Sequence, residues 1–154
     1  MNQFIGNIDA KTDAKGRVFI PAAFRKILQT AEDSRLILRK DIYKDCLVLY
    51  PLEAWNNELS KLRSRLDEYD EDQRDFYLQF VSDSESVEMD SNGRILIPKR
   101  YLQIADITSD VRFVGVNDTI NIWSRPKLEA FLKANNEVFK QNARKFLSKS
   151  SSHE

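Results

Sequence analysis

The sequence is poor in the residues that build disulfides, metal centres and phosphate-binding loops. Its 154 residues include one cysteine, one histidine and four glycines. The cysteine, Cys46, cannot form an internal disulfide, and no second cysteine or nearby histidine gives it the spacing of a zinc site. Four scattered glycines do not make a loop that cradles phosphates. We therefore expect no metal, no cofactor and no small-molecule substrate. Cys46 is expected to pack as a small apolar residue, with a reactive thiol as the alternative.

Long hydrophobic runs are also missing. The longest apolar segments, such as Cys46 to Tyr50, are far too short to cross a bilayer. The first residues, Met1-Asn2-Gln3, lack the basic and apolar regions of a secretion signal. These absences predict a cytoplasmic protein without a membrane partner. With 42% hydrophobic residues, the chain can still build one substantial core or two small ones.

Neither charge is in excess, because 24 Lys and Arg balance 24 Asp and Glu. The charges are nevertheless segregated along the chain. Basic residues outnumber acidic ones in residues 1–30. This segment contains Asp9 and Asp13 against Lys11, Lys15, Arg17, Arg25 and Lys26. Acidic residues outnumber basic ones in residues 67–75. The only basic residue there is Arg74, and the acidic ones are Asp67, Glu68, Asp70, Glu71, Asp72 and Asp75. This distribution predicts a positive and a negative side, although either cluster alone is equally compatible with a solvated face.

One motif occurs twice and organises the chain. The segment Asp13-Ala14-Lys15-Gly16-Arg17-Val18-Phe19-Ile20-Pro21 matches Asp90-Ser91-Asn92-Gly93-Arg94-Ile95-Leu96-Ile97-Pro98, 77 residues later. The correspondence continues with Phe24 and Tyr101, and with Ile27 and Ile104. Such a repeat predicts two similar structural units.

The motif has the chemistry of a tight turn between strands. Asp13 and Asp90 can accept hydrogen bonds from the following amides, and Gly16 and Gly93 tolerate the left-handed conformation that returns the chain. Prolines close both motifs and suit the first turn of a short helix. The expected apolar faces of these helices are Phe24, Ile27 and Leu28 in the first half, and Tyr101, Ile104 and Ala105 in the second.

The same pattern predicts an α+β fold in which two pseudo-symmetric halves pack together. Each half reads as strand, turn, strand, short helix, a second hairpin and a closing helix. Each half is too small to close a core alone, so we expect the two to pack on each other as one pseudo-twofold domain with flanking helices. The expected divisions are a first half at 1–66, an acidic helical connection at 67–86, a second half at 87–147 and a disordered tail at 148–154.

Apolar stripes mark the expected flanking helices. In the first half Trp55, Leu59, Leu62 and Leu66 recur at helical spacing, followed by Phe76 and Phe80. A comparable stripe near the C-terminus consists of Leu128, Phe131, Leu132, Phe139, Ala143 and Phe146. We expect these stripes to form core or subunit contacts rather than a ligand site.

The doubled arginine is the strongest functional feature. A two-stranded ribbon can enter the DNA major groove, where an arginine can donate two parallel hydrogen bonds to guanine or contact phosphate. The alternation of a strand places Arg17 away from Val18 and Ile20, so that it can face solvent. Arg94 occupies the same place in the second motif. The candidate DNA-binding residues are Arg17, Arg94, Lys15, Asn92 and Lys11, with Arg25 able to widen the basic patch.

A purely structural interpretation of the two arginines is also open. Arg17 and Arg94 can brace their own turns by pairing with Asp13 and Asp90. A simple turn needs the aspartate and the glycine, but it does not need an arginine after the glycine both times. The two roles are compatible if the aspartate orients an arginine that touches DNA.

The sequence resembles the MraZ family, whose members are tandem versions of the AbrB-type swapped-hairpin DNA-binding fold. In the first half the resemblance rests on Phe4, Gly6, Asp13, Gly16-Arg17, Pro21, Tyr43, Cys46-Leu47, Leu49-Tyr50-Pro51 and Trp55. In the second half it rests on Asp90, on Gly93 to Pro98 and on Trp123. The sequence departs from the family pattern at Ser84, Ser86 and Leu102.

The resemblance implies that the two halves pack as one swapped-hairpin (AbrB-like) barrel with flanking helices, and it implies a function as well. It implies a nucleoid-associated transcriptional regulator of the division and cell wall gene cluster, which binds short G-rich direct repeats upstream of its own operon as a ring-shaped homo-oligomer. In the family, the arginine of each Asp-x-x-x-Arg motif is tied to DNA binding. These positions are Arg17 and Arg94 in this sequence.

Two rival classes of function make different demands on the sequence. An enzyme would use Asp13 and Asp90 as paired carboxylates, but an arginine four residues after each favours the ionised form over proton transfer. A protein-interaction module, antitoxin-like or an oligomeric scaffold, draws support from the C-terminal segment 133–149. The only acidic residue in that segment is Glu137, and the basic ones are Lys133, Lys140, Arg144, Lys145 and Lys149.

Overall fold

The computed structural model describes residues 3–148 of the chain. Met1, Asn2 and nearly all of the tail expected at 148–154, including His153, lie outside these residues. The first half contains β1 (Asn7–Lys11), β2 (Arg17–Phe19), α1 (Ala22–Gln29), β3 (Leu36–Lys40), β4 (Leu47–Pro51) and α2 (Leu52–Arg65). It is followed by α3 (Glu71–Ser82), β5 (Glu85–Val87), β6 (Arg94–Leu96), α4 (Lys99–Ile104), β7 (Asp110–Val116), β8 (Thr119–Ser124), α5 (Arg125–Ala134) and α6 (Asn136–Phe146).

The strands interleave the two halves of the chain. A six-stranded antiparallel sheet has the order β1-β7-β8-β4-β3-β5, so β1 of the first half pairs with β7 of the second, and β4 pairs with β8. A separate two-stranded ribbon joins β2 to β6. The predicted α+β class and the packing of two similar halves on each other are present in this arrangement.

The predicted barrel is not found in the described part of the chain. Within residues 3–148 the strands do not close into a barrel, because β2 and β6 pair with each other and leave β1 and β5 as sheet edges. The strands that flank each Asp-x-x-Gly-Arg turn pair mainly with other strands instead of with each other. Apart from the isolated bridge between Thr12 and Val18, β1 pairs with β7 and β2 pairs with β6. This exchange lets Val18 and Ile95 face each other in the core, where both are 1% exposed.

Other sequence-based expectations hold with small shifts. The helices at the motif ends are α1 and α4, but Pro21 and Pro98 occupy the N-cap position before each helix instead of its first turn. A two-residue turn at Asn117-Asp118 joins β7 to β8, and Asn117 has a positive φ of 60°, which suits such a turn. The segment expected as a helical connection ends in β5, which pairs with β3. Cys46 is buried, as expected of a packed apolar residue.

The main core lies between the large sheet, the ribbon and helices α1 and α4. It includes the fully buried side chains of Phe24 and Tyr101, one from each half, together with Phe4, Ile20, Leu38, Ile97, Phe113, Ile120 and Ile122. Aromatic edges contribute to it, since the rings of Phe4 and Phe24 lie 5.6 Å apart in an edge-to-face arrangement. Because the core draws on both halves, it orders the ribbon and the sheet together.

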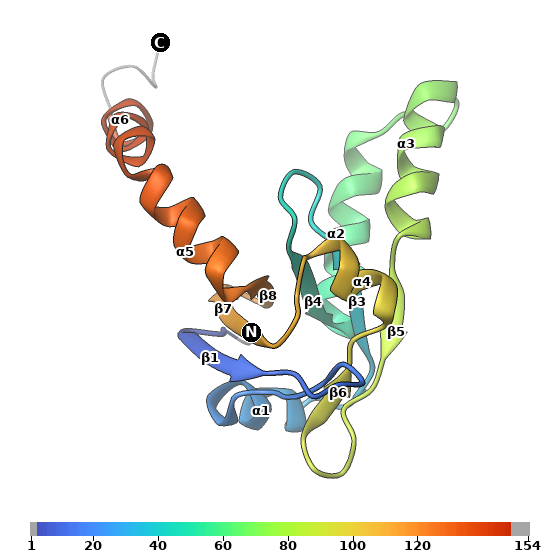
Figure 1. Cartoon of the computed structure of the whole chain (residues 1–154). Helices are drawn as coiled ribbons and strands as arrows, with labels where there is room; N and C mark the ends of the chain where they lie inside the picture. The colour runs from blue at the N-terminus through green and yellow to red at the C-terminus, as the bar shows by residue number, and fades with distance from the viewer. Residues whose placement is uncertain (1–2, 149–154) are drawn as a thin grey trace.

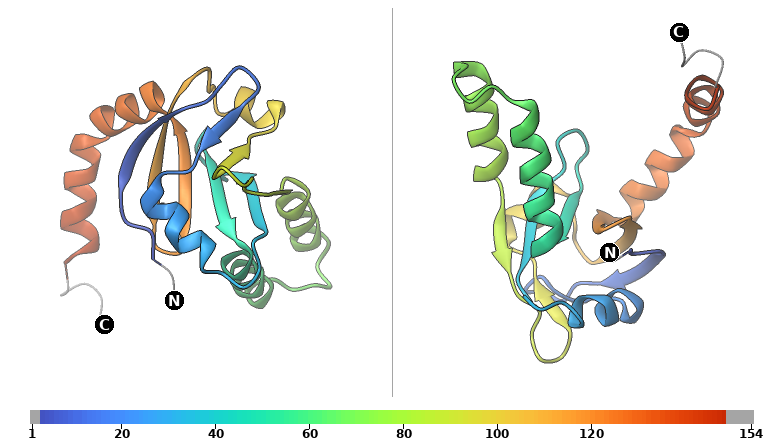
Figure 2. Two further views of the ribbon diagram at one scale, coloured as in Figure 1. Left: turned by 90° about the horizontal axis from the view of Figure 1, so that it is seen from below. Right: turned by 180° about the vertical axis from the view of Figure 1, so that it is seen from behind.

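Two helical projections leave the sheet on opposite sides. One is a hairpin of α2 and α3, and the other is an arm of α5 and α6 (Figure 1). The views from below and from behind show the same separation (Figure 2). In Figure 1 both projections rise away from the turn that precedes β6. No helix within residues 3–148 is long and apolar enough to cross a membrane.

Each projection has its own apolar base. The hairpin rests on the sheet through a cluster in which Trp55 stacks on Phe80 at 5.9 Å and contacts Tyr50. The buried side chain of Arg39 lies 4.3 Å from the centre of the Phe80 ring and donates to the hydroxyl of Tyr50. The arm rests on a smaller cluster of Cys46, Trp123 and Leu128, with Phe131 stacked on Trp123. In the first predicted stripe Leu59 and Leu62 also pack against the cluster of the hairpin, whereas Phe139 and Phe146 of the second stripe are exposed.

The buried hydroxyl of Tyr101 ties α4 to β3 and to the end of α3. It contacts the backbone carbonyl groups of Leu38 and Asp83 and accepts a hydrogen bond from Arg100. Replacement Tyr101→Phe removes the donor to these carbonyl groups, whereas Arg100 keeps its pairing with Asp83 and Glu85, so we expect a loss of about 1–3 kcal/mol in the free energy of unfolding. Urea denaturation measures this loss. Tyr69→Phe is the matched control, because Tyr69 is 87% exposed, and an equal loss in both variants would contradict the assignment.

Candidate nucleic-acid interface

The first turn is held by one aspartate. The carboxylate oxygen Oδ1 of Asp13 accepts hydrogen bonds of 2.9 Å from the backbone amides of Lys15 and Arg17. Its second oxygen, Oδ2, accepts a hydrogen bond of 2.7 Å from Nε of the Arg17 side chain. Gly16 completes the turn with a φ of 93°, which a residue with a side chain rarely adopts. One carboxylate thus fixes both the loop and the arginine that follows it.

The second turn repeats this arrangement. Oδ1 of Asp90 accepts hydrogen bonds of 2.9 Å from the amides of Asn92 and Arg94, and Oδ2 accepts one of 2.9 Å from Nε of Arg94. Gly93 has a φ of 87°. The repeat found in the sequence is therefore a repeat of the hydrogen-bond pattern, and Asn92 takes the place of Lys15 at the second turn.

Hydrogen bonds cross between the turns. The amide of Ile20 donates to the carbonyl of Gly93 at 3.0 Å, and the amide of Ile97 donates to the carbonyl of Gly16 at 2.9 Å. The two bonds are equivalent about the pseudo-twofold axis of the ribbon. Each turn is therefore completed by the strand that follows the other turn.

The ribbon has one buried and one exposed face. Val18 and Ile95 lie opposite each other on the buried face. On the other face Arg17 lies opposite Leu96, and Phe19 lies opposite Arg94. This arrangement brings the two motif arginines together on one surface, as the alternation of the strands predicts.

Side chains from the short helices fill the space beneath each glycine. A Cβ atom at Gly93 would lie 2.5 Å from the Arg25 side chain, and one at Gly16 would lie 3.0 Å from Leu102 and 2.7 Å from the carbonyl oxygen of Ile97. Arg25 and Leu102 occupy equivalent positions in the two halves. Each helix thus supports the turn of the opposite half.

The chemistry of the two arginines favours an anionic partner. Their Nε atoms are held by the aspartates, whereas within residues 3–148 no hydrogen bond engages the terminal nitrogens of either guanidinium group. The side chains of Arg17 and Arg94 are 39% and 27% exposed. A guanidinium group oriented in this way can present two parallel donors to a phosphate or to a guanine edge.

The other candidate residues lie at different places around the ribbon. Lys15 and Asn92 are exposed at the two turn tips. Lys11 lies at the end of β1, where its Nζ atom pairs with Asp110 at 3.2 Å. Arg25 is committed to the fold, because its Nη1 atom donates to the carbonyl of Ile20 beneath the second turn. The predicted basic patch therefore consists of the turn tips and the ribbon face, and Arg25 supports it from below.

Sequence reasoning gave no role to Phe19 and Leu96, which the structure places between the arginines. They are 55% and 52% exposed, and the guanidinium carbon of Arg94 lies 5.7 Å from the centre of the Phe19 ring. The alternation of the strand already put Phe19 beside Arg17. The missing signal was the partner strand, since only its register shows that Phe19 supports the arginine of the other half.

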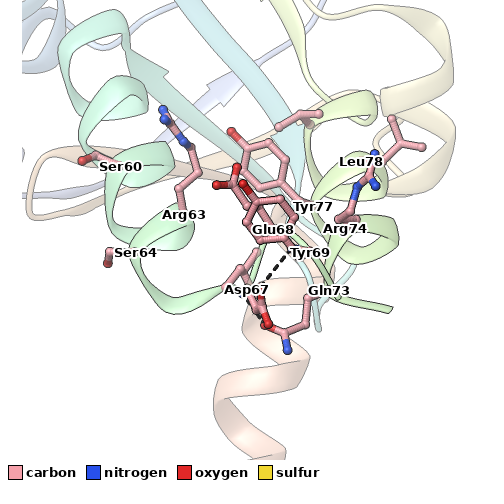
Figure 3. A pocket seen from close by; sticks show the side chains of 12 residues that line it. Ser60, Arg63, Ser64, Asp67, Glu68, Tyr69, Gln73, Arg74, Tyr77 and Leu78 are labelled. Atoms are coloured by element: carbon pink, nitrogen blue, oxygen red, sulfur yellow. Dashed lines mark hydrogen bonds between the residues drawn. The ribbon is translucent and has the colours of Figure 1, made fainter. Parts of the chain in front are cut away.

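The remaining surface offers other kinds of site. A groove of about 930 Å³ lies between α2 and α3, lined in part by Arg63, Tyr69, Tyr77 and Leu78 (Figure 3). A smaller cavity of about 560 Å³ lies between α3 and the loop after β3. Across the described part of the chain, no three His, Cys, Asp or Glu residues are grouped so as to hold a metal ion.

Comparison with known proteins places this chain in a family. The family model described as "MraZ protein, putative antitoxin-like" matches residues 4–78 and 80–149. The chain belongs to the MraZ family. The resemblance inferred from the doubled motif is thereby confirmed.

Relatives from this family match most of the chain. A protein of Bacteroides fragilis named "Transcriptional regulator MraZ" is 54% identical over 151 residues, which are 94% of this chain and 96% of the relative. The protein of that name from Bacteroides thetaiotaomicron is 57% identical over 129 residues, 84% and 83% of the two chains. The one from Acetivibrio thermocellus is 39% identical over 128 residues, 83% and 85% of the two chains.

The pKa values of the two turn aspartates are lowered in this member of the MraZ family. The backbone hydrogen bond from Arg17, followed by the hydrogen bond from its side chain, lowers the pKa of Asp13 from 3.8 to about 2. The equivalent bonds from Arg94 lower the pKa of Asp90. A carboxylate with a lowered pKa is a poor proton donor at neutral pH, which argues against the acid–base enzyme considered above.

We expect a carbon-detected NMR titration to give Asp13 a midpoint near pH 2. Because the folded pKa lies below the unfolded value, the turn is stabilised above about pH 4 and loses this contribution as the pH falls through 2. In Arg17→Ala the backbone amide bonds persist, so the midpoint should rise only part of the way towards 3.8. A wild-type midpoint at 3.8 would show that the carboxylate is not engaged as described.

Proposed function

We propose that this chain is a DNA-binding transcriptional regulator that contacts double-stranded DNA through the exposed face of the β2–β6 ribbon. The observation that carries the proposal is the pair of arginines. Each is held at Nε by an aspartate, and its terminal nitrogens make no hydrogen bond to another group among residues 3–148. The names of the relatives support the regulatory role. The strand exchange in the ribbon is the arrangement expected of an AbrB-like swapped hairpin.

The two interpretations of the arginines combine in this proposal. Asp13 and Asp90 brace the arginines, and bracing lowers the conformational entropy that a long side chain loses on binding. Arg17 and Arg94 read base edges or phosphates. Lys15 and Asn92 at the turn tips, with Lys11 at the edge of β1, contribute backbone contacts that set the position of the ribbon on the duplex.

The target that we propose is a set of short G-rich direct repeats upstream of the division and cell wall gene cluster. Guanine offers two acceptors in the major groove, N7 and O6, and these match the two donors of an arginine. A chain with no net charge and one basic ribbon has limited affinity for a single site. We propose that several copies assemble as a homo-oligomer, in a ring, and bind several repeats at once, which raises the overall affinity.

The test compares binding of the wild type, Arg17→Ala, Arg94→Ala and the double variant to a duplex of spaced G-rich repeats. Each single change should weaken binding by about 1–3 kcal/mol if the arginine reads a base. Fluorescence anisotropy at fixed salt measures the affinity, with a scrambled duplex as reference.

Arg35→Ala is the matched control for this experiment. Arg35 is also an exposed arginine paired with a nearby aspartate, since its Nη2 atom lies 2.6 Å from Asp33, but it lies outside the ribbon. We expect its affinity to equal that of the wild type. Unchanged affinity in the double variant, or an equal loss in the control, would overturn the assignment of the ribbon as the DNA-binding surface.

A further inference from the structure

Two large apolar side chains lie on the exposed face of the β2–β6 ribbon. Phe19 and Leu96 are 55% and 52% exposed. The solvent-facing positions of an antiparallel pair usually carry polar residues, and the apolar residues face the core. In this ribbon the inward positions are already filled by Val18 and Ile95, which are buried. The core does not use the outer apolar pair, which indicates that a partner covers it.

Arginine and apolar side chains alternate on this face. In the register of the two strands, Arg17 lies opposite Leu96 and Phe19 lies opposite Arg94. The two arginines therefore occupy one diagonal of the face and the two apolar residues occupy the other. Residues directly opposite each other in an antiparallel pair lie about 5 Å apart, and residues two positions apart along a strand lie about 7 Å apart. Each apolar side chain thus has an arginine across from it and another along its own strand.

The face is held rigidly from the inside. Ile20 and Ile97, which follow the two strands, are fully buried in the core. Within the face, the guanidinium carbon of Arg94 lies 5.7 Å from the centre of the Phe19 ring. A ribbon anchored in this way presents its outer side chains at fixed spacings, which a surface that reads a regular polymer requires.

The charges on the face specify the chemistry of the partner. The terminal nitrogens of Arg17 and Arg94 make no hydrogen bond within residues 3–148, whereas the carboxylates of Asp13 and Asp90 are engaged by their own turns. The face therefore offers hydrogen-bond donors beside apolar surface. Its complement carries acceptors beside an apolar group. The major groove of DNA has this composition, because guanine presents two acceptors there and thymine presents its C5-methyl group.

The spacings of the ribbon also match those of the bases. Successive base pairs are about 3.4 Å apart along the duplex, so distances of about 5–7 Å on the ribbon correspond to one or two base pairs. We propose that Phe19 and Leu96 contact the C5-methyl groups of thymines one or two base pairs from the guanines bound by Arg17 and Arg94. This inference rests on the DNA binding proposed above and adds a second class of base to its target. The apolar pair distinguishes thymine from cytosine, which lacks the methyl group.

The test uses duplexes that differ only in methyl groups. The first carries one G-rich repeat in which every base pair within two steps of the guanines is A·T. The second has deoxyuridine in place of those thymines, so that pairing with adenine is kept and the C5-methyl group is removed. A third has the same number of deoxyuridines outside this range and controls for general effects of the substitution on the duplex. Fluorescence anisotropy measures the affinity of the full chain for each.

We expect the wild type to bind the thymine duplex more tightly than the deoxyuridine duplex, by about fourfold for each methyl group that it covers. The variant that combines Phe19→Ala and Leu96→Ala should bind the two duplexes equally. Both side chains are exposed, so the variant should keep its core, and circular dichroism checks this. The wild type should bind the third duplex as it binds the first.

Two further variants sharpen the comparison. Phe139→Ala is the matched control, because Phe139 is also an exposed phenylalanine, at 65%, but lies in α6 outside the ribbon. It should keep the full wild-type preference for thymine. Phe19→Leu removes the ring beside Arg94 but keeps an apolar side chain, so it too should prefer thymine. Loss of the preference in Phe19→Leu would overturn the methyl contact.

Failure of this inference and failure of the proposed function give different results. If the wild type binds the first two duplexes equally but loses affinity on Arg17→Ala with Arg94→Ala, the arginines read DNA and the methyl contact is wrong. If the double arginine variant binds as the wild type does, the proposed function fails.

Three other outcomes overturn the inference alone. A double alanine variant that binds more weakly but keeps the preference for thymine shows that the apolar pair only positions the arginines. Equal losses on the second and third duplexes show a general effect on the DNA. An apolar pair that enters the minor groove, or that a second protein covers, does not sense a methyl group in the major groove, so the wild type then binds the first two duplexes equally.

Discussion

The pair of backbone hydrogen bonds that crosses from each half to the turn of the other is the constraint on which the rest of the structure depends. Ile20 bonds to Gly93, and Ile97 bonds to Gly16. Both isoleucine side chains are fully buried, so the bonds that shape the turns also anchor the core. Each turn is shaped by its own aspartate and glycine and is completed by a hydrogen bond from the other half, so the two copies of the motif support each other.

The local chemistry of the turns could be predicted from the sequence. Aspartate, glycine and proline occur at spacings with a direct physical meaning, and the alternation of the strands separates Arg17 from Val18. The choice of strand partners could not be predicted. A period of two shows which face is buried, but it is the same whether β2 pairs with β1 or with β6. The barrel was expected from the family resemblance, but the strands of residues 3–148 do not close into one, and the role of Arg25 beneath Gly93 was missed.

For the helices too, the sequence predicts the local structure but not the packing partner. The spacing of Trp55 and Leu59 predicted a helix with one apolar face, and α2 has that form. The spacing does not show what covers the face, because a core contact and a contact between subunits produce the same stripe. Trp55 is 7% exposed against the sheet, whereas Phe139 in the arm is 65% exposed. Tertiary structure was needed to distinguish the anchored base of each projection from its free end.

The pseudo-twofold symmetry of the ribbon is incomplete, and the differences lie at its surface and directly beneath it. Lys15 corresponds to Asn92, Phe19 to Leu96, and Arg25 to Leu102. A perfect twofold ribbon would be unchanged by a half-turn and would meet both orientations of a DNA sequence in the same way. These three pairs remove that equivalence and give the ribbon a direction. A directional ribbon suits sites that all point the same way along the duplex, whereas a symmetric one would suit palindromes.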